Sequence, residues 1–337
     1  LALKTKGYYT LTNMEKQQIK DEIVSKRNVL TVFPEIVDPD YCFVVLQGRV
    51  TYSPVLTDKS AAQIQELVKQ AIYDYNEREL NTFKSTFRLS KLQYYIEQAE
   101  SSITSSDIDI YLQRRVKLET GGTNTYIINF NTPLRKGDYA FKLNSYPTIK
   151  VKDDANIQRD VFIEETPESY TGIDSVYVQN PGMNYTSMPT LSITGDGTGA
   201  TVEPVIVNGR FVSVKVTNPG INYTRAFVNV TDSLGSGAVL SVNLKATVGT
   251  LRTYYYKSNG EKVIVNSSAG TIDYISGKVI LSSLTPISMP ANDFYDQDVL
   301  TINVVPELTV IPPLRNRLLA IDTNNIQSIQ LNMVPQV

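Results

Sequence analysis

The stretch NPGMNYT at residues 180–186 returns as NPGINYT at residues 218–224, with six of its seven residues unchanged. The match extends well beyond these turns. IDSVYVQ from Ile173 aligns with FVSVKVT from Phe211, at the same offset of 38 residues. Self-similarity at a fixed period is the signature of a duplicated structural unit. A whole unit of the chain has therefore been duplicated.

Each copy reads as strands joined by a turn. Pro181 sets the φ angle needed at the second position of a type II turn, and Gly182 supplies the positive φ at the third. TLSITG at 190–195 alternates apolar and polar residues, as an extended strand does. A strand before the turn is predicted by Ile173, Val176 and Val178. One such unit is too small to bury a core alone, so the two copies are expected to share one.

Two motifs inside the unit have a functional and a structural interpretation. Asn184-Tyr-Thr and Asn222-Tyr-Thr fit the N-glycosylation pattern, but turn preferences alone explain the Asn, Pro and Gly here. GDGTGA at 195–200 has Gly195, Gly197 and Gly199, without the spacing or the following helix of a phosphate-binding loop. A hairpin loop is predicted there instead.

The composition describes a folded chain of two or three domains. It has 337 residues, 42% hydrophobic and 20% charged, with a net charge of −2. That charge gives no long-range field to attract nucleic acid or an anionic membrane, and no run approaches the roughly 20 apolar residues of a membrane span. The chain begins at Leu1 without a signal-peptide pattern, so we expect a fragment of a longer protein.

The residue types argue against catalysis. There is no histidine, which removes the commonest general base, and one cysteine, which excludes an intrachain disulfide or a zinc thiolate set. Cys42 lies in the apolar run YCFVVL and is predicted to be a buried hydrophobic residue. The 21 tyrosines suit strand surfaces and protein interfaces, although tyrosine also stacks on sugars.

Two groups of acidic residues could form a catalytic or a metal-binding site. Asp107 and Asp109 share one face of a strand, where paired carboxylates could hydrolyse a glycoside, but a solvated face or edge protection is commoner. A second group does not have the spacing of a helical calcium loop, and a solvated loop is favoured for Asn292, Asp293, Asp296 and Asp298. No catalytic, cofactor-binding or metal residue, and no cofactor, is predicted.

The N-terminal third mixes helices with strands. Capping-box spacings, Ser or Thr followed three residues later by Glu or Gln, predict three helix starts, at Thr12, Ser60 and Ser90. Apolar residues at steps of three and four follow each start, most clearly at 60–80. DIDIYLQRRVKLE at 107–119 alternates as an exposed-edge or half-buried strand. Helices packed against one face of a sheet would bury all these apolar stripes.

From Gly121 onward the chain reads as short strands. Turns at Asn259-Gly260 and Ser276-Gly277 predict two hairpins. The predicted fold class is α+β: an N-terminal two-layer helix/sheet domain, then a mainly antiparallel β domain with an inserted tandem β repeat. The predicted boundaries are 1–120 for the first domain, 121–172 with 246–337 for the second, and 173–245 for the repeat.

Residues 32–118 resemble the baseplate J-like family of contractile phage tails. The resemblance is carried by VFPEIVDPDYCFVVLQGRVTYSP, by SAAQIQELVKQAIYDYNERELNTFKSTFRLSKL and by SSDIDIYLQRRVKLE. NTYIINFNTPL, AGTIDYISGKVIL and PPLRNRLLAIDTNNIQSIQL are similar to the C-terminal portion of the ring-forming wedge proteins of T4-like phages. The likeness covers 1–172 and 246–337, so 173–245 is an insertion, expected to bind an accessory virion protein.

The resemblance implies a structural virion protein and no enzyme. Such a protein self-associates as a homodimer, joins baseplate wedges into a ring around the tail tube, and binds other wedge subunits. It would be assembled in the host cytoplasm into the phage tail baseplate, without nucleic acid or membrane partners. The alternative is a host-surface β module that binds a carbohydrate or receptor, suggested by the tyrosine-rich repeat.

Overall fold

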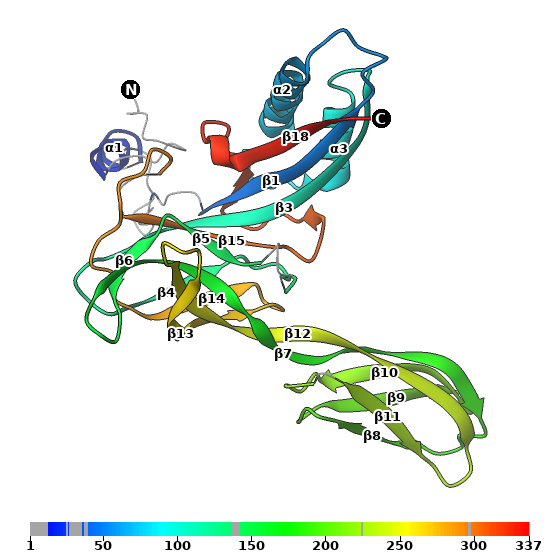
Figure 1. The fold of residues 1–337 in the computed structure, drawn as a ribbon. Coiled ribbons are helices and arrows are strands. Elements are labelled where there is room, and N and C mark those ends of the chain that lie inside the picture. Colours follow the sequence, from blue (N-terminus) through cyan, green and yellow to red (C-terminus); the bar gives the residue numbers. More distant parts are fainter. Residues whose placement is uncertain are drawn as a thin grey trace. The chain divides into compact units, whose positions relative to one another are not determined.

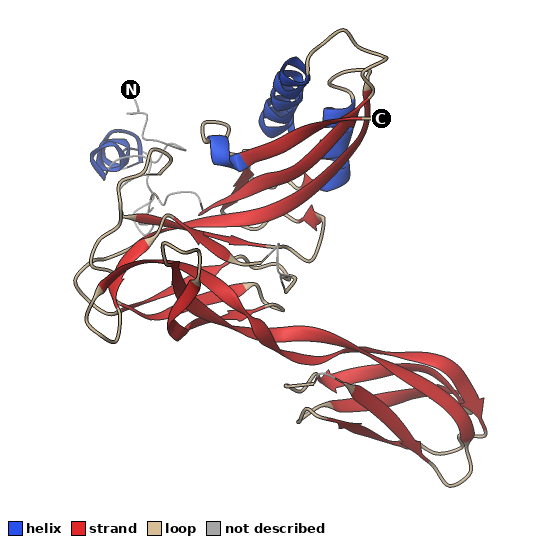
Figure 2. Cartoon of the chain, viewed as in Figure 1, coloured by secondary structure: helices blue, strands red, loops and turns tan. Residues whose placement is uncertain are grey.

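The computed structural model describes residues 13–24, 26, 36, 40–136, 142–223, 225–295 and 298–336, and these are mainly β with a few helices (Figure 2). Two compact units make up the chain. The first unit contains 1–122, 144–151 and 286–337, and the second contains 123–143 and 152–285. The boundaries predicted from the sequence, including those of the repeat at 173 and 245, remain predictions.

A mixed sheet forms the centre of the first unit (Figure 1). Its order is β17-β1-β3-β15-β5, and β18 also pairs with β1. The pairs of β1 with β17 and with β18 are parallel, whereas β1–β3, β3–β15 and β15–β5 are antiparallel. The strands are β1 (Asp40–Tyr52), β3 (Ile103–Lys117), β5 (Asn144–Tyr146), β15 (Val299–Val304), β17 (Arg317–Ala320) and β18 (Ile329–Pro335). Because β3 pairs with β1 on one side and with β15 on the other, it is not an edge strand. Of the two predicted alternatives, exposed edge or half-buried strand, the second applies.

Helices α2 (Ala61–Glu79) and α3 (Leu89–Glu97) cover one face of this sheet (Figure 2). The predicted start of α2 is confirmed: Ser60 is its N-cap and forms the capping box with Gln63. Its apolar stripe is buried through Ile64, Val68, Ile72 and Tyr75. The predicted packing of these stripes against a sheet is therefore confirmed for α2.

The predicted start of α3 at Ser90 is wrong. The helix begins one residue earlier, and its N-cap, Arg88, makes no side-chain capping bond. Arg88 belongs to β2 (Phe87–Arg88), which pairs with β16 (Val310–Ile311). The backbone N–H of Leu89 donates to the Thr309 carbonyl at 3.0 Å. A tertiary contact thus satisfies one of the N–H groups that the start of a helix leaves without an intrahelical partner.

The remaining short elements are α1 (Asn13–Ile19), the π-helix Lys20–Val24, β6 (Ile149–Lys152) and the 3-10 turn Ile326–Ser328. The predicted cap at Thr12 lies outside the described residues. Among the helices in the described ranges, none has the length and apolarity to cross a membrane.

The second unit is built on an antiparallel sheet with the order β7-β12-β13-β14-β4. Both predicted hairpins are confirmed, because β12 turns into β13 at Gly260 and β13 into β14 at Gly277, each with positive φ. The strands are β4 (Asn124–Asn129), β7 (Gln158–Met183), β12 (Ser236–Tyr256), β13 (Lys262–Asp273) and β14 (Lys278–Leu284).

The long strands β7 and β12 continue from this sheet into the duplicated segment, which we call the repeat lobe (residues 171–246; Figure 1). There they form a four-stranded sheet with the order β9-β10-β7-β12, while β8 and β11 form a separate pair. The core cluster of the lobe takes side chains from both sheets. The lobe strands are β8 (Thr190–Gly195), β9 (Thr201–Val207), β10 (Arg210–Asn218) and β11 (Ala226–Thr231).

The positive φ predicted for the repeat glycines is confirmed, but in the first copy the strand does not end at the Asn-Pro-Gly motif: β7 continues to Met183 and pairs there with β12. Gly182 and Gly220 both have positive φ, and each N–H donates to the side-chain oxygen of the Asn two residues before it, at 3.0 Å. The predicted hairpin at GDGTGA is wrong. β8 pairs with β11 and β9 with β10, so the loop crosses from one sheet to the other. Its glycines are needed because a Cβ on Gly197 would lie 2.4 Å from the Tyr223 ring.

Candidate functional site

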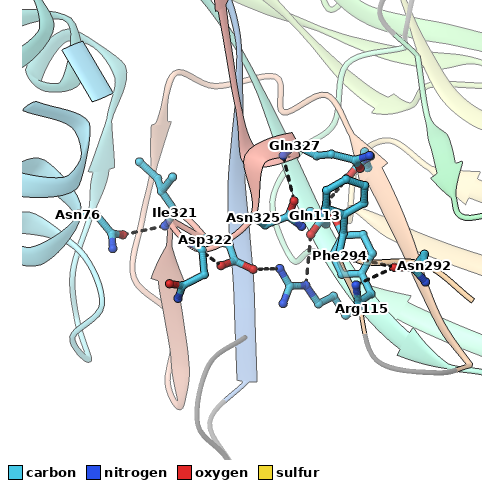
Figure 3. A network of polar contacts seen from close by, with 12 residues as sticks. Asn76, Gln113, Arg115, Asn292, Phe294, Ile321, Asp322, Asn325 and Gln327 are labelled. Carbon is cyan, nitrogen blue, oxygen red and sulfur yellow. Dashed lines mark hydrogen bonds and ion pairs between the residues drawn. The ribbon is translucent and has the colours of Figure 1, made fainter. Parts of the chain in front are cut away.

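The helix-bearing part of the first unit, residues 40–115, runs from β1 through α2 and α3 to most of β3. Tyr75 on α2 is fully buried, and its hydroxyl accepts from the Arg88 N–H at 3.2 Å. Burial raises the pKa of Tyr75 to about 12. The Asn76 side-chain oxygen accepts from the Ile321 N–H at 2.7 Å, which ties α2 to the segment after β17 (Figure 3). These contacts hold the helix rigidly on the sheet.

A buried polar network lies where β3 meets β15 (Figure 3). Arg115 pairs with Asp322, whose side chain is 2% exposed. The guanidinium lies over the Phe43 ring, 3.8 Å from its centroid. The neighbouring Gln113 donates to the Tyr295 hydroxyl at 3.2 Å and so links the strand to the loop before β15. These contacts tie β3 to β1, to the loop before β15 and to the segment after β17.

An apolar tip is exposed on the loop between β1 and α2. We use this name for Val55 and Leu56, whose relative exposures are 90% and 63%. The loop follows Tyr52, whose carbonyl accepts from the Gln336 N–H at 2.7 Å. Exposed apolar surface that is contiguous and surrounded by polar residues is the kind that marks protein–protein contacts. The tip is therefore the candidate contact of residues 40–115.

The structure does not build a catalytic pair from Asp107 and Asp109. Asp107 forms an ion pair with Arg49 on β1 at 3.1 Å, with both side chains largely exposed. Opposite Asp109 on β1 lies Gln47. An exposed ion pair between neighbouring strands is typical of a strand face in contact with water. The solvated-face interpretation is the one that this geometry supports.

The acidic group near Asn292 is organised as a turn. The Asn292 side-chain oxygen accepts from the N–H groups of Phe294 and Tyr295, at 3.0 and 2.7 Å (Figure 3). Asp298 has a positive φ, and its carbonyl accepts from the Leu118 N–H. Asp296 lies outside the described residues. Among the residues that the structure describes, no three acidic, cysteine or histidine side chains could share a metal ion.

In the second unit, one buried carboxylate binds three cations. The Glu164 side chain is 0% exposed, and its oxygens lie 2.6 Å from Lys142 Nζ, 2.7 Å from Arg252 Nη2 and 2.9 Å from Lys262 Nζ. Burial raises the pKa of this carboxyl, but hydrogen bonds from the three cations outweigh burial and hold it below its usual value. Lys262 also lies 4.1 Å from the centroid of the Tyr254 ring.

Neither buried network was found from the sequence. Glu164 and Arg115 each lie in an alternating strand beside a residue of the same charge, and such pairs are ordinary on solvated strands. Cys42 was predicted correctly: it is 1% exposed, and burial raises the pKa of its thiol. The repeat tyrosines Tyr185 and Tyr223 are each 3% exposed, so they pack the lobe and present no ring face to a sugar.

Comparison with known proteins gives a match over the helix-bearing part of the first unit. Residues 40–115 match the family model described as baseplate structural protein gp6, C-terminal domain III. The chain is also 26% identical, over 117 residues, to the baseplate wedge protein gp6 of Enterobacteria phage T4. That alignment covers 35% of this chain and 18% of the T4 protein. The chain therefore matches less than a fifth of that relative's length.

Proposed function

Because this chain is a gp6-like baseplate structural protein that carries the family's C-terminal domain III, we propose that it self-associates to join baseplate wedges into a ring around the tail tube. The family is one of structural baseplate proteins, which implies a non-enzymatic role. In this proposal the chain resides in the virion and also binds other wedge subunits.

The observation that carries the proposal is the match of residues 40–115 together with the apolar tip on that same segment. A ring subunit needs a surface that another protein covers, and interface cores are depleted in charged residues. The tip has that chemistry, and the strand before it is tied to β18 through the bond between the Gln336 N–H and the Tyr52 carbonyl. Burying Val55 and Leu56 would contribute about 1.5–3 kcal/mol each.

The test is the mass of the chain in solution over a concentration series, measured by light scattering after gel filtration. The parent chain is expected to form a concentration-dependent dimer. Replacing both tip residues with aspartate, V55D with L56D, should weaken that dimer about a hundredfold or more. Val212→Asp is the matched control, because Val212 is 59% exposed but lies on the repeat lobe.

Thermal unfolding of each variant shows whether the fold survives the change. A parent chain that stays monomeric at every concentration would count against self-association. If Val212→Asp weakened the dimer as much as V55D with L56D does, the apolar tip would not be the contact.

A further inference from the structure

The two copies of the repeat are related by an internal two-fold axis. Val176 on β7 and Val214 on β10 occupy the same place in the two copies, and they are directly paired with each other across antiparallel strands. A residue that faces its own counterpart marks the axis of a symmetric pair. The counterparts Ile173 and Phe211 beside them are both 2% exposed. The axis therefore passes through the centre of the lobe core.

Contacts away from the axis occur twice, as the symmetry requires. The Tyr185 N–H donates to the Gly209 carbonyl at 3.1 Å, and the Tyr223 N–H donates to the Thr171 carbonyl at 3.0 Å. Residues 171 and 209 are themselves counterparts. Each of these bonds runs from one copy to the start of the other, so neither copy can make it alone.

The tyrosine rings are exchanged in the same way. A Cβ placed on Gly235, in the second copy, would lie 2.2 Å from the Tyr185 ring of the first. A Cβ placed on Gly197, in the first copy, would lie 2.4 Å from the Tyr223 ring of the second. Each ring lies directly against the glycine loop of the other copy. This is the reciprocal packing of a dimer interface in which one patch meets itself.

We propose that the repeat lobe is a homodimer fused into one chain, so the surface that each copy presents to the other fits a second copy of the same unit. The partner is recognised by the glycine loop that receives the tyrosine and by the strand that pairs at the axis. A chain with a single copy is then expected to bind a second chain through this surface. This inference does not depend on the proposed function.

The geometry of such a dimer follows from the lobe. The turn between β9 and β10, at Asn208-Gly209, is the counterpart of residues 170–171, where β7 enters the lobe. With one copy removed, the entry strand of a second chain takes the place of that turn. Because β7 and β10 are antiparallel at the axis, the entry strands of two chains would approach it from opposite directions.

The experiment removes one copy from the chain in a Cys42→Ala background. Deleting 173–210 joins Gly172 to Phe211 and preserves the register, because the deleted length equals the repeat offset. Val214→Cys in this chain should give a disulfide-linked dimer under mild oxidation, since directly opposed antiparallel residues lie within disulfide reach. Ser241→Cys is the matched control: Ser241 lies on β12, away from the axis, and should not cross-link.

Two further chains protect the test against a single misfolded variant. Deleting 201–238 keeps the other turn, and Val176→Cys in that chain should also link two chains. The undeleted chain with Val176→Cys and Val214→Cys should form an intrachain disulfide, whatever self-association occurs elsewhere. Monomeric one-copy chains, or one-copy chains that link equally well through Ser241→Cys, would overturn the inference. Failure of the intrachain disulfide would overturn the axis itself.

Discussion

Replacing Glu164 with glutamine tests whether the buried carboxylate holds its sheet together. The change keeps the shape of the side chain but leaves three cations without the charge that they share. Removing one partner of a buried ion pair costs about 3–5 kcal/mol. The cations here are partly exposed, at 22–28%, and water will screen them. We therefore take the lower end, about 3 kcal/mol.

The assay is thermal unfolding, followed by fluorescence of the tyrosines, at neutral pH. In a unit of this size, about 3 kcal/mol corresponds to a fall of roughly 6–12 °C in the unfolding midpoint. The matched control is Glu261→Gln, which removes an exposed glutamate paired with Lys257 at 3.1 Å and should leave the midpoint unchanged. Adding Lys262→Met to Glu164→Gln should restore part of the loss, because one uncompensated cation is removed.

The same carboxylate predicts how stability depends on pH. Its pKa is lower in the folded state than in the unfolded chain. The stabilisation is therefore complete above the unfolded pKa and is lost as the pH falls through the folded pKa. The free energy of unfolding should therefore fall less steeply with decreasing pH in the Glu164→Gln chain than in the parent; this fall at acidic pH is the acid limb of the stability curve. Equal costs for Glu164→Gln and Glu261→Gln, or an unchanged acid limb, would refute the reasoning.

Two further predictions compare positions that look alike in sequence. Ser60→Ala removes the side-chain cap of α2 and should cost about 1 kcal/mol, whereas Ser90→Ala should cost little, since Ser90 caps nothing; denaturant midpoints of the two variants decide this, and similar losses would contradict the observed start of α3. Gly235→Ala and Gly197→Ala each drive a methyl group into a buried tyrosine ring, Tyr185 in the first case. Each substitution should lower the stability of the lobe by about 1–3 kcal/mol, measured by hydrogen exchange of its backbone amides. A large difference between the two costs would contradict the two-fold symmetry.

Local signals predicted local features well. Three local features are confirmed: the capping box at Ser60, the hairpin turns at Gly260 and Gly277, and the positive φ of the glycines in the duplicated Asn-Pro-Gly motif. All of them depend on residues close in sequence. The capping signal at Ser90 failed because contacts with a distant segment, β16 and Thr309, hold the chain at Phe87–Leu89, and the helix begins there. Propensity was overridden there by tertiary structure.

Features that depend on distant partners were not predictable. The apolar run YCFVVL at 41–46 indicates a buried strand, but it carries no direction, so the parallel pairing of β1 with β17 and β18 was missed. The loop at 195–200 was assigned to a hairpin because its composition suits one, yet neighbouring strands pair elsewhere. Glu164 gave no signal because its three cations come from distant parts of the chain.

Joining both halves of the lobe in one chain also changes how the lobe responds to dilution. A pair of separate subunits dissociates as its concentration falls, whereas two tethered copies face each other at an effective concentration that a short linker sets in the millimolar range. The link here is the two-residue turn Asn208-Gly209. The lobe can therefore fold in a newly made subunit before any neighbour is present.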